Sequence, residues 1–248
     1  MSGHSKWSTI KRKKGALDAR RGKMFSKLSK EITVAAKEGG SGDLEMNPRL
    51  RLAVQNAKGA NMPKDNIERA INKGTGGSGE QYFELTYEGY APNGVAVFVE
   101  CMTDNQNRTV SAVRAAFNKY SGSLGTNGSL EFIFDRKGIF NLPRPEGMDL
   151  EEFELELIDG GAEEVELEDG YVHVTCALED FGNLNKKFEE LNIVPESAEL
   201  NRIPNTLVAL DDETLPKVMK LIDALEDDDD VQKVYHNIDI SESQMELI

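Results

Sequence analysis

The 248-residue sequence predicts an α+β protein whose N-terminal part is a three-helix bundle. Up to a glycine-rich segment at 74–79, apolar residues recur three or four positions apart, which is the spacing of helices. After that segment they gather in short strand-like runs. These runs and the helical patterns between them follow the order β-α-β-β-α-β twice, which is the order of a ferredoxin-like domain. Because one series interrupts the other, we predict one ferredoxin-like domain inserted in another.

Residues 1–22 are predicted to form a flexible basic arm, because they hold few apolar positions that a core could bury. The predicted bundle follows at 23–80. Its first helix begins near Met24, directs Leu28 and Ile32 inward, and ends at the glycines of 39–42. Its second helix begins at Asn47-Pro48, a pair that suits a helix N-terminus.

The third predicted helix lies in the segment "KGANMPKDNIERAINKG" at 58–74. Pro63 suits its first position, since the missing N–H has no partner there, and Gly74 suits the position after its last turn. Ile67, Ala70 and Ile71 repeat at helical spacing and form an inward face. The glycine-rich segment 74–79 then reads as a linker.

The first ferredoxin-like domain is predicted to comprise residues 81–136 and 204–248. Its expected strands are 82–90, 95–103, 129–135, 205–211 and 231–240, and its expected helices are 107–120 and 213–225. Leu130, Phe132 and Phe134 alternate, so we expect them on one side of the strand at 129–135. Asn107 is the expected cap of the helix at 107–120.

The inserted domain is predicted at 137–203. Its expected elements are a strand at 138–143, a helix at 149–159, a hairpin at 162–177, a helix at 179–191 and a strand at 197–203. The dipeptide Asp169-Gly170 is a strong hairpin signal. With that turn, Leu167 pairs with Val172 and Val165 pairs with Val174.

Charge divides the chain unevenly. Residues 1–73 hold 17 Lys and Arg against 7 Asp and Glu, whereas the remainder holds 12 against 37. An asymmetry of this kind indicates nucleic-acid binding by the basic part. The alternative is a solvated charged face, which is the commoner origin of short charge runs. The acidic run 226–230 is interpreted in that way, as a solvated turn.

The candidate nucleic-acid-binding residues are the cations of the arm and of the predicted outer helix faces. They are Lys6, Lys11, Arg12, Lys13, Lys14, Arg20, Arg21, Lys23, Lys27, Lys30, Lys58, Lys64, Arg69 and Lys73. Basic residues bind the phosphate backbone of nucleic acids without reading sequence. Trp7, which lies between Lys6 and the cations at 11–14, either stacks on a base or packs on the bundle.

Other classes of function find little support in the residues. The longest segment without charge is too short to span a membrane, and the N-terminus lacks the apolar stretch of a secretory signal. Cys101 and Cys176 lie in apolar runs, which indicates buried free thiols and a cytoplasmic protein. Neither a metal-ligand spacing nor a nucleophile with a base is recognisable, so we expect no enzyme, cofactor, metal site or small-molecule substrate.

Three segments closely resemble the YebC/PmpR family. They are "GHSKWSTIKRKKGALDARRGKMFSKLSKEI", "NPRLRLAVQNAKGANMPKDNIERAINKG" and "EGYAPNGVAVFVECMTDNQNRTVSAVRAAFNKYSGSLGTNGSLEFIF". The resemblance covers nearly the whole chain, although the part between 143 and 203 matches only loosely. It implies a helical N-terminal domain with two ferredoxin-like domains, and it implies no catalytic residues or metal.

The resemblance also implies a role in gene expression. The family is described as DNA-binding transcriptional regulators, which implies a cytoplasmic regulator of transcription. Its members include the mitochondrial translational activator of cytochrome c oxidase subunit one, and bacterial relatives are proposed to assist elongation on the ribosome. The alternative expectation is therefore an RNA-binding translation factor that contacts the ribosome through ribosomal RNA. Cations spread over an arm and three helices, without an obvious base-reading helix, suit this alternative.

Overall fold

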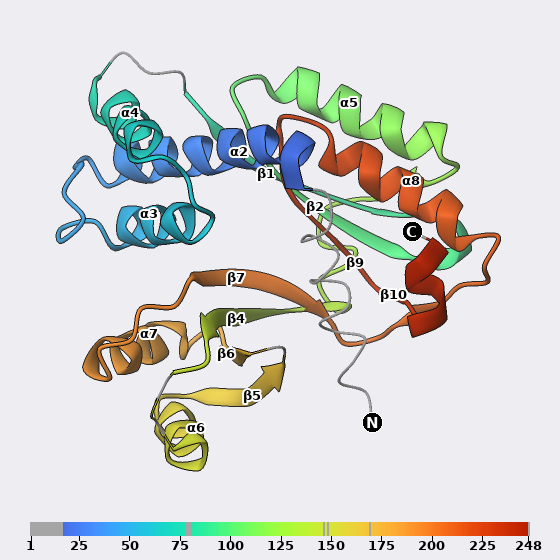
Figure 1. The fold of residues 1–248 in the computed structure, drawn as a ribbon. Helices are drawn as coiled ribbons and strands as arrows, with labels where there is room; N and C mark the ends of the chain where they lie inside the picture. The colour runs from blue at the N-terminus through green and yellow to red at the C-terminus, as the bar shows by residue number, and fades with distance from the viewer. Residues whose placement is uncertain (1–16, 78–80, 146, 148, 169, 248) are drawn as a thin grey trace. The chain divides into compact units, whose positions relative to one another are not determined.

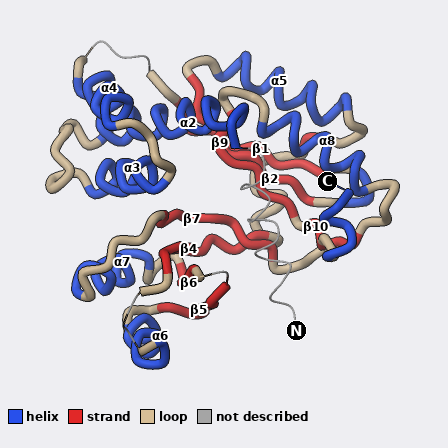
Figure 2. The backbone as a smooth tube through the Cα atoms, in the orientation of Figure 1, coloured by secondary structure: helices blue, strands red, loops and turns tan. Residues whose placement is uncertain are grey.

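The computed structural model describes residues 17–77, 81–145, 147, 149–168 and 170–247. The described residues form two compact units. One contains residues 17–27, 81–135 and 203–247, and the other contains the described parts of 28–77 and 136–202. Helices and strands occur in both units, as Figures 1 and 2 show. The predicted α+β class is therefore confirmed.

The first unit is built on a four-stranded antiparallel sheet. Its strands are β1 (Phe83–Tyr90), β2 (Ala96–Thr103), β3 (Ser123–Leu124) and β9 (Val231–His236), in the order β3-β1-β2-β9. The short helix η2 (Pro92–Gly94) joins β1 to β2. Helices α5 (Gln106–Lys119) and α8 (Leu215–Glu226) pack side by side on one face of the sheet (Figure 1). Alternate residues of β2, among them Val97 and Val99, bury their side chains against Phe117 of α5 and Leu221 of α8.

The C-terminal part of the first unit differs from the expected strands. Of the predicted strand 205–211, only β8 (Val208–Ala209) forms, and it pairs in parallel with β10 (Ile238–Asp239) outside the main sheet. The short helix η3 (Glu242–Leu247) ends the described chain. The helix predicted from residue 107 begins at Gln106, and its cap is Asn105 rather than Asn107: the Asn105 side chain accepts a hydrogen bond from the Arg108 amide.

The segment predicted as a strand at 129–135 is also different. Residues 127–133 form turns, and a strand begins only at Phe134. The cause is the buried carboxylate of Glu88 on β1, which accepts hydrogen bonds from the Gly128 amide at 2.8 Å and the Leu130 amide at 2.7 Å. These hydrogen bonds take the place of the strand-to-strand hydrogen bonds that the segment would form in a sheet. Leu130 and Phe134 are buried as expected, but Phe132 is 72% exposed.

This turn segment supplies the cover for the second face of the first sheet. Leu130, Ile133 and Phe134 pack with Ala96 and Phe98, the residues of β2 that face away from α5 and α8. The rings of Phe98 and Phe134 meet edge to face, with centroids 6.3 Å apart. The second face of the sheet is therefore also covered where Ala96 and Phe98 lie.

The second unit contains the other sheet, whose order is β5-β6-β4-β7. Its elements are β4 (Phe134–Pro143), α6 (Leu150–Asp159), β5 (Ala162–Glu168), β6 (Tyr171–Ala177), α7 (Phe181–Glu190) and β7 (Ser197–Pro204). This is the ferredoxin-like order that the sequence predicts. The predicted pairs Leu167–Val172 and Val165–Val174 are both present, and Gly170 adopts the left-handed conformation with φ +82°. Asp169 lies outside the described residues.

The predicted three-helix region consists of α2 (Leu17–Glu38), α3 (Pro48–Gly59) and α4 (Lys64–Thr75). Helix α2 begins within the range predicted as arm, and residues 1–16 lie outside the described residues. Asn47 caps α3 by accepting a hydrogen bond from the Leu50 amide. Pro63 is the N-cap of α4 rather than its first residue.

Gly74 was expected beyond the end of α4, but the helix continues to Thr75. The reason is packing between helices. A Cβ atom at Gly74 would lie 2.5 Å from the Thr33 carbonyl oxygen and 2.7 Å from Cβ of Ala36, so glycine lets α4 approach α2 closely. The Thr33 hydroxyl also donates to the Ala70 carbonyl at 3.1 Å.

Helix α3 is attached to the edge of the second sheet by one buried side chain. Asn56 donates its amide to the Ala198 carbonyl at 3.0 Å and accepts from the Ala198 amide at 2.9 Å. It thereby pairs with edge strand β7 as another strand would. One helical turn away, Gly59 lies against the Glu196 backbone. Helices α3 and α4 and the inserted sheet thus belong to one packed body.

We expect the Gly59→Ala substitution to break this attachment. A Cβ atom at position 59 would lie 1.8 Å from the Glu196 carbonyl oxygen, a backbone atom that cannot rotate away. The free energy of unfolding, measured by urea denaturation, should fall by about 1–3 kcal/mol or more. The matched control is Gly22→Ala in α2, where no atom lies within 4 Å, and it should stabilise by about 0.5–1 kcal/mol. Equal effects at the two positions would contradict this packing.

Candidate nucleic-acid interface

Four of the predicted interface residues, Lys58, Lys64, Arg69 and Lys73, lie on α3 and α4. Because Ile67 and Ala70 take the inward face of α4, Lys64, Arg69 and Lys73 lie outside it and are exposed. The four-residue connection 60–63 places Lys58, in the last turn of α3, and Lys64, in the first turn of α4, at its two ends.

The geometry of that connection is well defined. Asn61 adopts a left-handed conformation with φ +58°, and its amide donates to the Lys58 carbonyl at 2.9 Å. The Met62 amide donates to the Ala57 carbonyl, and the Met62 side chain is buried. The backbone that carries Lys58 and Lys64 is therefore fixed, while their side chains remain in solvent.

Charge on α3 and α4 is positive, although Arg49 pairs with Glu38 and Arg51 lies 3.9 Å from Glu45. The two helices contain six Lys and Arg against two acids. Lys64 lies 3.5 Å from Glu68, a solvent-exposed pair of the kind that contributes little and exchanges readily. Within the described part of the chain, Lys58 and Arg69 form no ion pair. Such a surface can accept phosphate oxygens at low cost.

The predicted cations at the start of α2 have partners inside the first unit. Lys23 donates to the carbonyl of Asp227 at 3.0 Å and to its carboxylate at 2.8 Å. Lys27 donates to the Glu226 carbonyl at 2.9 Å. Both lysines thus donate hydrogen bonds to backbone carbonyls at the C-terminal end of α8, where the helix dipole favours cations. A phosphate would have to compete with these contacts.

The remaining predicted cations lie either on α2 or outside the described residues. The Arg21 guanidinium lies 5.9 Å from the centroid of the Phe25 ring, and Lys30 is half-buried on α2. Lys6, Lys11, Arg12, Lys13 and Lys14 lie outside the described residues, as does Trp7, and the side chain of Arg20 is not described.

The acidic run 226–230 is more than a solvated turn. Asp230 is buried, and its carboxylate receives two N–H groups of Arg108 at 2.9 and 2.7 Å and the Thr109 hydroxyl at 3.0 Å. These hydrogen bonds raise the pKa of Arg108, with Asp104 adding a further contribution. The start of α5 is therefore held to the turn before β9, and Arg108 is occupied rather than presented to an external anion.

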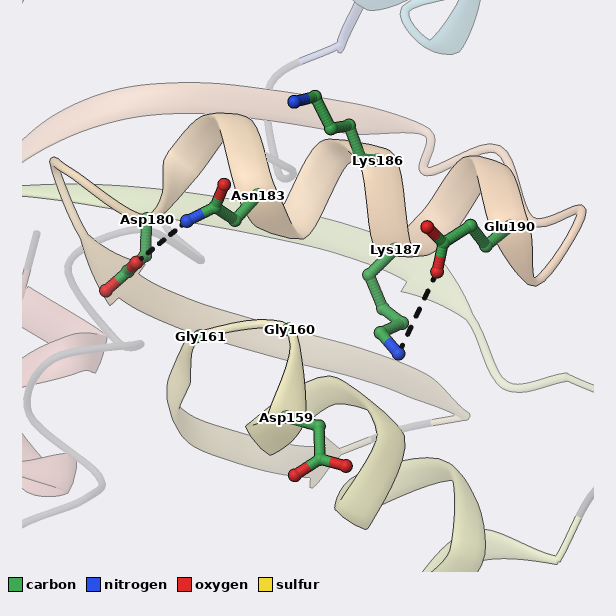
Figure 3. Close-up of a pocket in the computed structure, with 8 residues that line it drawn as sticks. All are labelled: Asp159, Gly160, Gly161, Asp180, Asn183, Lys186, Lys187 and Glu190. Atoms are coloured by element: carbon green, nitrogen blue, oxygen red, sulfur yellow. Dashed lines mark hydrogen bonds and ion pairs between the residues drawn. The ribbon is translucent and has the colours of Figure 1, made fainter.

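A hollow of about 370 Å³ lies between the end of α6 and helix α7, and Figure 3 shows the residues around it. It is lined by Asp159, Gly160, Gly161, Asp180, Asn183, Lys186, Lys187 and Glu190. Several of the polar side chains around it form hydrogen bonds or ion pairs with other side chains of the protein. Asn183 donates to Asp180 at 3.2 Å, and Lys187 lies 3.0 Å from Glu156 and 3.9 Å from Glu190. The hydrogen bond from Lys187 to Glu156 raises the pKa of this lysine, so it stays a cation rather than a base. Lys186 points away from the hollow (Figure 3).

The two thiols are not suited to chemistry at neutral pH. Burial raises the pKa of Cys101 to about 12, with the carboxylates of Asp228 and Asp230 contributing, and burial raises that of Cys176 to about 11. Both cysteines are free and buried, as predicted. Among the described residues, no group of His, Cys, Asp and Glu is placed to hold a metal ion, and no helix is long and apolar enough to cross a membrane.

Sequence reasoning missed the side chains that fix these surfaces. Asn56, Glu88 and Asp230 each bind a segment more than 35 residues away along the chain. For Asn56 and Glu88 the local signal is a polar residue among apolar neighbours, whereas Asp230 stands in the acidic run 226–230 and has no such signal. Glu88 lies between Tyr87 and Gly89 in a strand, and Asn56 lies between inward-facing residues of a helix.

Known proteins are similar to this one along nearly the whole chain. Residues 5–77 match a family described as the TACO1/YebC protein N-terminal domain, and residues 82–238 match the TACO1/YebC second and third domain. A protein of Amoebophilus asiaticus named "Probable transcriptional regulatory protein" is 58% identical over 240 residues, which are 96% of this chain and 98% of that protein. A protein of Syntrophotalea carbinolica with the same name is 55% identical over 251 residues, covering 100% and 99%.

A solved structure is similar as well. The crystal structure of a conserved hypothetical protein from Aquifex aeolicus has a TM-score of 0.78 with this chain at 45% sequence identity. The match covers 91% of this chain and 93% of that one. It extends the similarity from sequence to fold.

The raised pKa values of the thiols predict how stability depends on pH. In the unfolded chain both thiols ionise near pH 9, whereas in the folded protein they stay protonated up to pH 11–12. The folded state therefore binds more protons in this window, and the free energy of unfolding falls as pH rises. We expect a loss on the order of 1 kcal/mol per pH unit for each thiol between pH 9 and 10.5. Urea denaturation of the wild type and of a Cys101→Ala/Cys176→Ala variant measures it, and parallel pH slopes would disprove the assignment.

Proposed function

The chain belongs to the TACO1/YebC family, and on this basis we propose that it is a cytoplasmic, non-enzymatic regulator of gene expression that binds nucleic acid. The observation that carries this proposal is the exposed set Lys58, Lys64, Arg69 and Lys73 on α3 and α4. The names of the relatives from Amoebophilus and Syntrophotalea favour a role in transcription, with DNA as the target.

The proposed contact is to phosphate. Lysine and arginine side chains on a rigid backbone neutralise phosphates and release counterions, a contribution that is independent of base sequence. The basic arm adds Lys6, Lys11, Arg12, Lys13 and Lys14 to this proposal. The proposal also includes Lys30, Arg20 and Arg21, whereas Lys23 and Lys27 would join only by leaving the end of α8.

Ribosomal RNA is the alternative target, in which case the protein would act in translation. One observation favours it. The exposed cations are not confined to one helix that could enter a major groove: Lys64, Arg69 and Lys73 lie on α4, and Lys58 lies on α3 across the connection 60–63. A folded RNA presents phosphates from several strands to such a surface.

The Lys64→Glu/Arg69→Glu variant tests the proposed phosphate contact. We expect its affinity for random-sequence duplex DNA to fall at least about tenfold near 0.1 M salt. The slope of log affinity against log salt should flatten by about 0.9 for each lost phosphate contact. Fluorescence anisotropy titrations from about 0.05 to 0.2 M salt measure both quantities. The same titrations with ribosomal RNA identify the preferred target.

The matched control is Lys217→Glu/Lys220→Glu on α8, which makes the same change of net charge at exposed positions. It should lower affinity far less. If both variants weaken binding equally, net charge alone is responsible. If neither does, α3 and α4 do not contact phosphate and the proposed interface is wrong.

A further inference from the structure

We propose that the carboxylate of Asp227 regulates the nucleic-acid interface by competing with phosphate for Lys23. Lys23 is one of the predicted interface residues, and its ammonium group lies 2.8 Å from this carboxylate. In the free protein Lys23 binds Asp227, and in the complex it binds a phosphate instead. This inference rests on the proposed function and adds to it an autoinhibitory contact, both partners of which belong to the first unit.

The C-terminal end of α8 carries an excess of negative charge. Helix α8 has no basic residue in its last turn, and the acidic run 226–230 begins at its last residue. The helix dipole makes acids unfavourable and cations favourable at this end. Lys23 and Lys27, which lie one turn apart on α2, supply cations there. The end of α8 thus offers Lys23 a carboxylate and a carbonyl oxygen, which are acceptors comparable with the oxygens of a phosphate.

The two lysines differ in how readily they can leave α8. The side chains of Lys23 and Asp227 are 43% and 69% exposed, and an ion pair exposed to this degree contributes little to stability. Lys27 is half-buried and donates to the Glu226 carbonyl at 2.9 Å. The Lys27 contact therefore keeps the start of α2 beside the end of α8, while the Lys23 side chain can turn from the carboxylate to another anion. Lys27 is the positioning residue of this arrangement.

The competition favours phosphate only where phosphates are closely spaced. Duplex DNA carries one negative charge for about every 1.7 Å of its axis, whereas Asp227 is a single carboxylate. Against an isolated anion from solution Asp227 has the advantage, because the folded chain already holds it in contact with Lys23. We therefore expect Lys23 to be exchanged onto a nucleic acid and to remain on α8 in the presence of small anions.

The Asp227→Asn variant removes the competing charge and keeps the shape of the side chain. We expect it to bind random-sequence duplex DNA about two- to fivefold more tightly than the wild type, as the loss of one exposed ion pair implies. The matched control is Glu226→Gln, which removes the same charge one residue away and keeps the carbonyl that Lys27 binds. Its affinity should change far less. Equal gains in the two variants would show general charge repulsion and would overturn the proposal.

A double-mutant cycle assigns the effect to Lys23. In a Lys23→Gln background there is no ammonium group for which Asp227 and phosphate can compete, so the Asp227→Asn substitution should no longer raise affinity. A gain as large as that in the wild-type background would contradict the competition. Lys23 and Asp227 are both exposed, so we expect these variants to keep the melting temperature of the wild type.

A zero-length crosslink follows the Lys23 side chain directly. A carbodiimide joins a lysine amine to a carboxylate where the two are in contact, and mass spectrometry of the digested full chain measures each linked peptide. Saturating duplex DNA without terminal phosphates should lower the yield of the Lys23–Asp227 amide at least about threefold. The Lys137–Glu163 pair, also 2.8 Å apart and in the other unit, is the internal control and should keep its yield. A Lys23–Asp227 yield that stays constant, or that falls only as much as the control, would refute the exchange.

Two outcomes separate this inference from the function on which it rests. If Lys64→Glu/Arg69→Glu weakens binding while Asp227→Asn leaves affinity unchanged, the phosphate interface stands and the competition by Asp227 is wrong. If neither duplex DNA nor ribosomal RNA binds the wild-type chain, the proposed function is wrong and the competition is wrong with it.

Discussion

The buried amide of Asn56 is the contact on which the proposed interface depends. By pairing with both backbone groups of Ala198, it closes the exposed edge of the second sheet and fixes α3 against β7. Helix α4 is in turn locked to α2 by the absence of a side chain at Gly74. The cations of α3 and α4 therefore lie on helices that are packed on a β-sheet. In the proposed complex, phosphates would bind a rigid surface and not separate, mobile helices.

Local pattern was enough to predict the elements whose partners are close in sequence. Glu168 pairs with Tyr171, so the connection between β5 and β6 is two residues long, and this short connection fixes the pairing of Leu167 and Val165 as the sequence predicts. Helix α3 likewise has its cap, Asn47, next to it in the sequence, and both α3 and α4 carry their apolar faces within their own residues. The segment 129–135 fails for the opposite reason. Its alternation suits a strand, but Glu88, some 40 residues earlier, binds its amides first.

For the candidate site, too, local features could be predicted from the sequence and long-range contacts could not. The positive charge of the N-terminal region is visible in the composition, but composition does not say which cations are already bound. Lys23 and Lys27 have the same spacing and residue type as exposed lysines, yet they contact Asp227 and Glu226 about 200 residues away. Arg108 is similarly taken by Asp230. A charge count therefore overstates how many side chains meet a ligand, and the acidic run that supplies these partners is partly neutralised within its own unit.

The carboxylate of Glu88 also sets how the turn 127–133 moves. Turns without regular secondary structure usually exchange their amide hydrogens with solvent quickly, because water reaches them by small local openings. Here the Gly128 and Leu130 amides are held by a buried carboxylate, and opening the turn would leave that carboxylate buried without these hydrogen bonds. Opening the turn should therefore cost nearly as much free energy as opening the sheet beneath it. The amide hydrogens of this irregular segment should then exchange as slowly as those of a core strand.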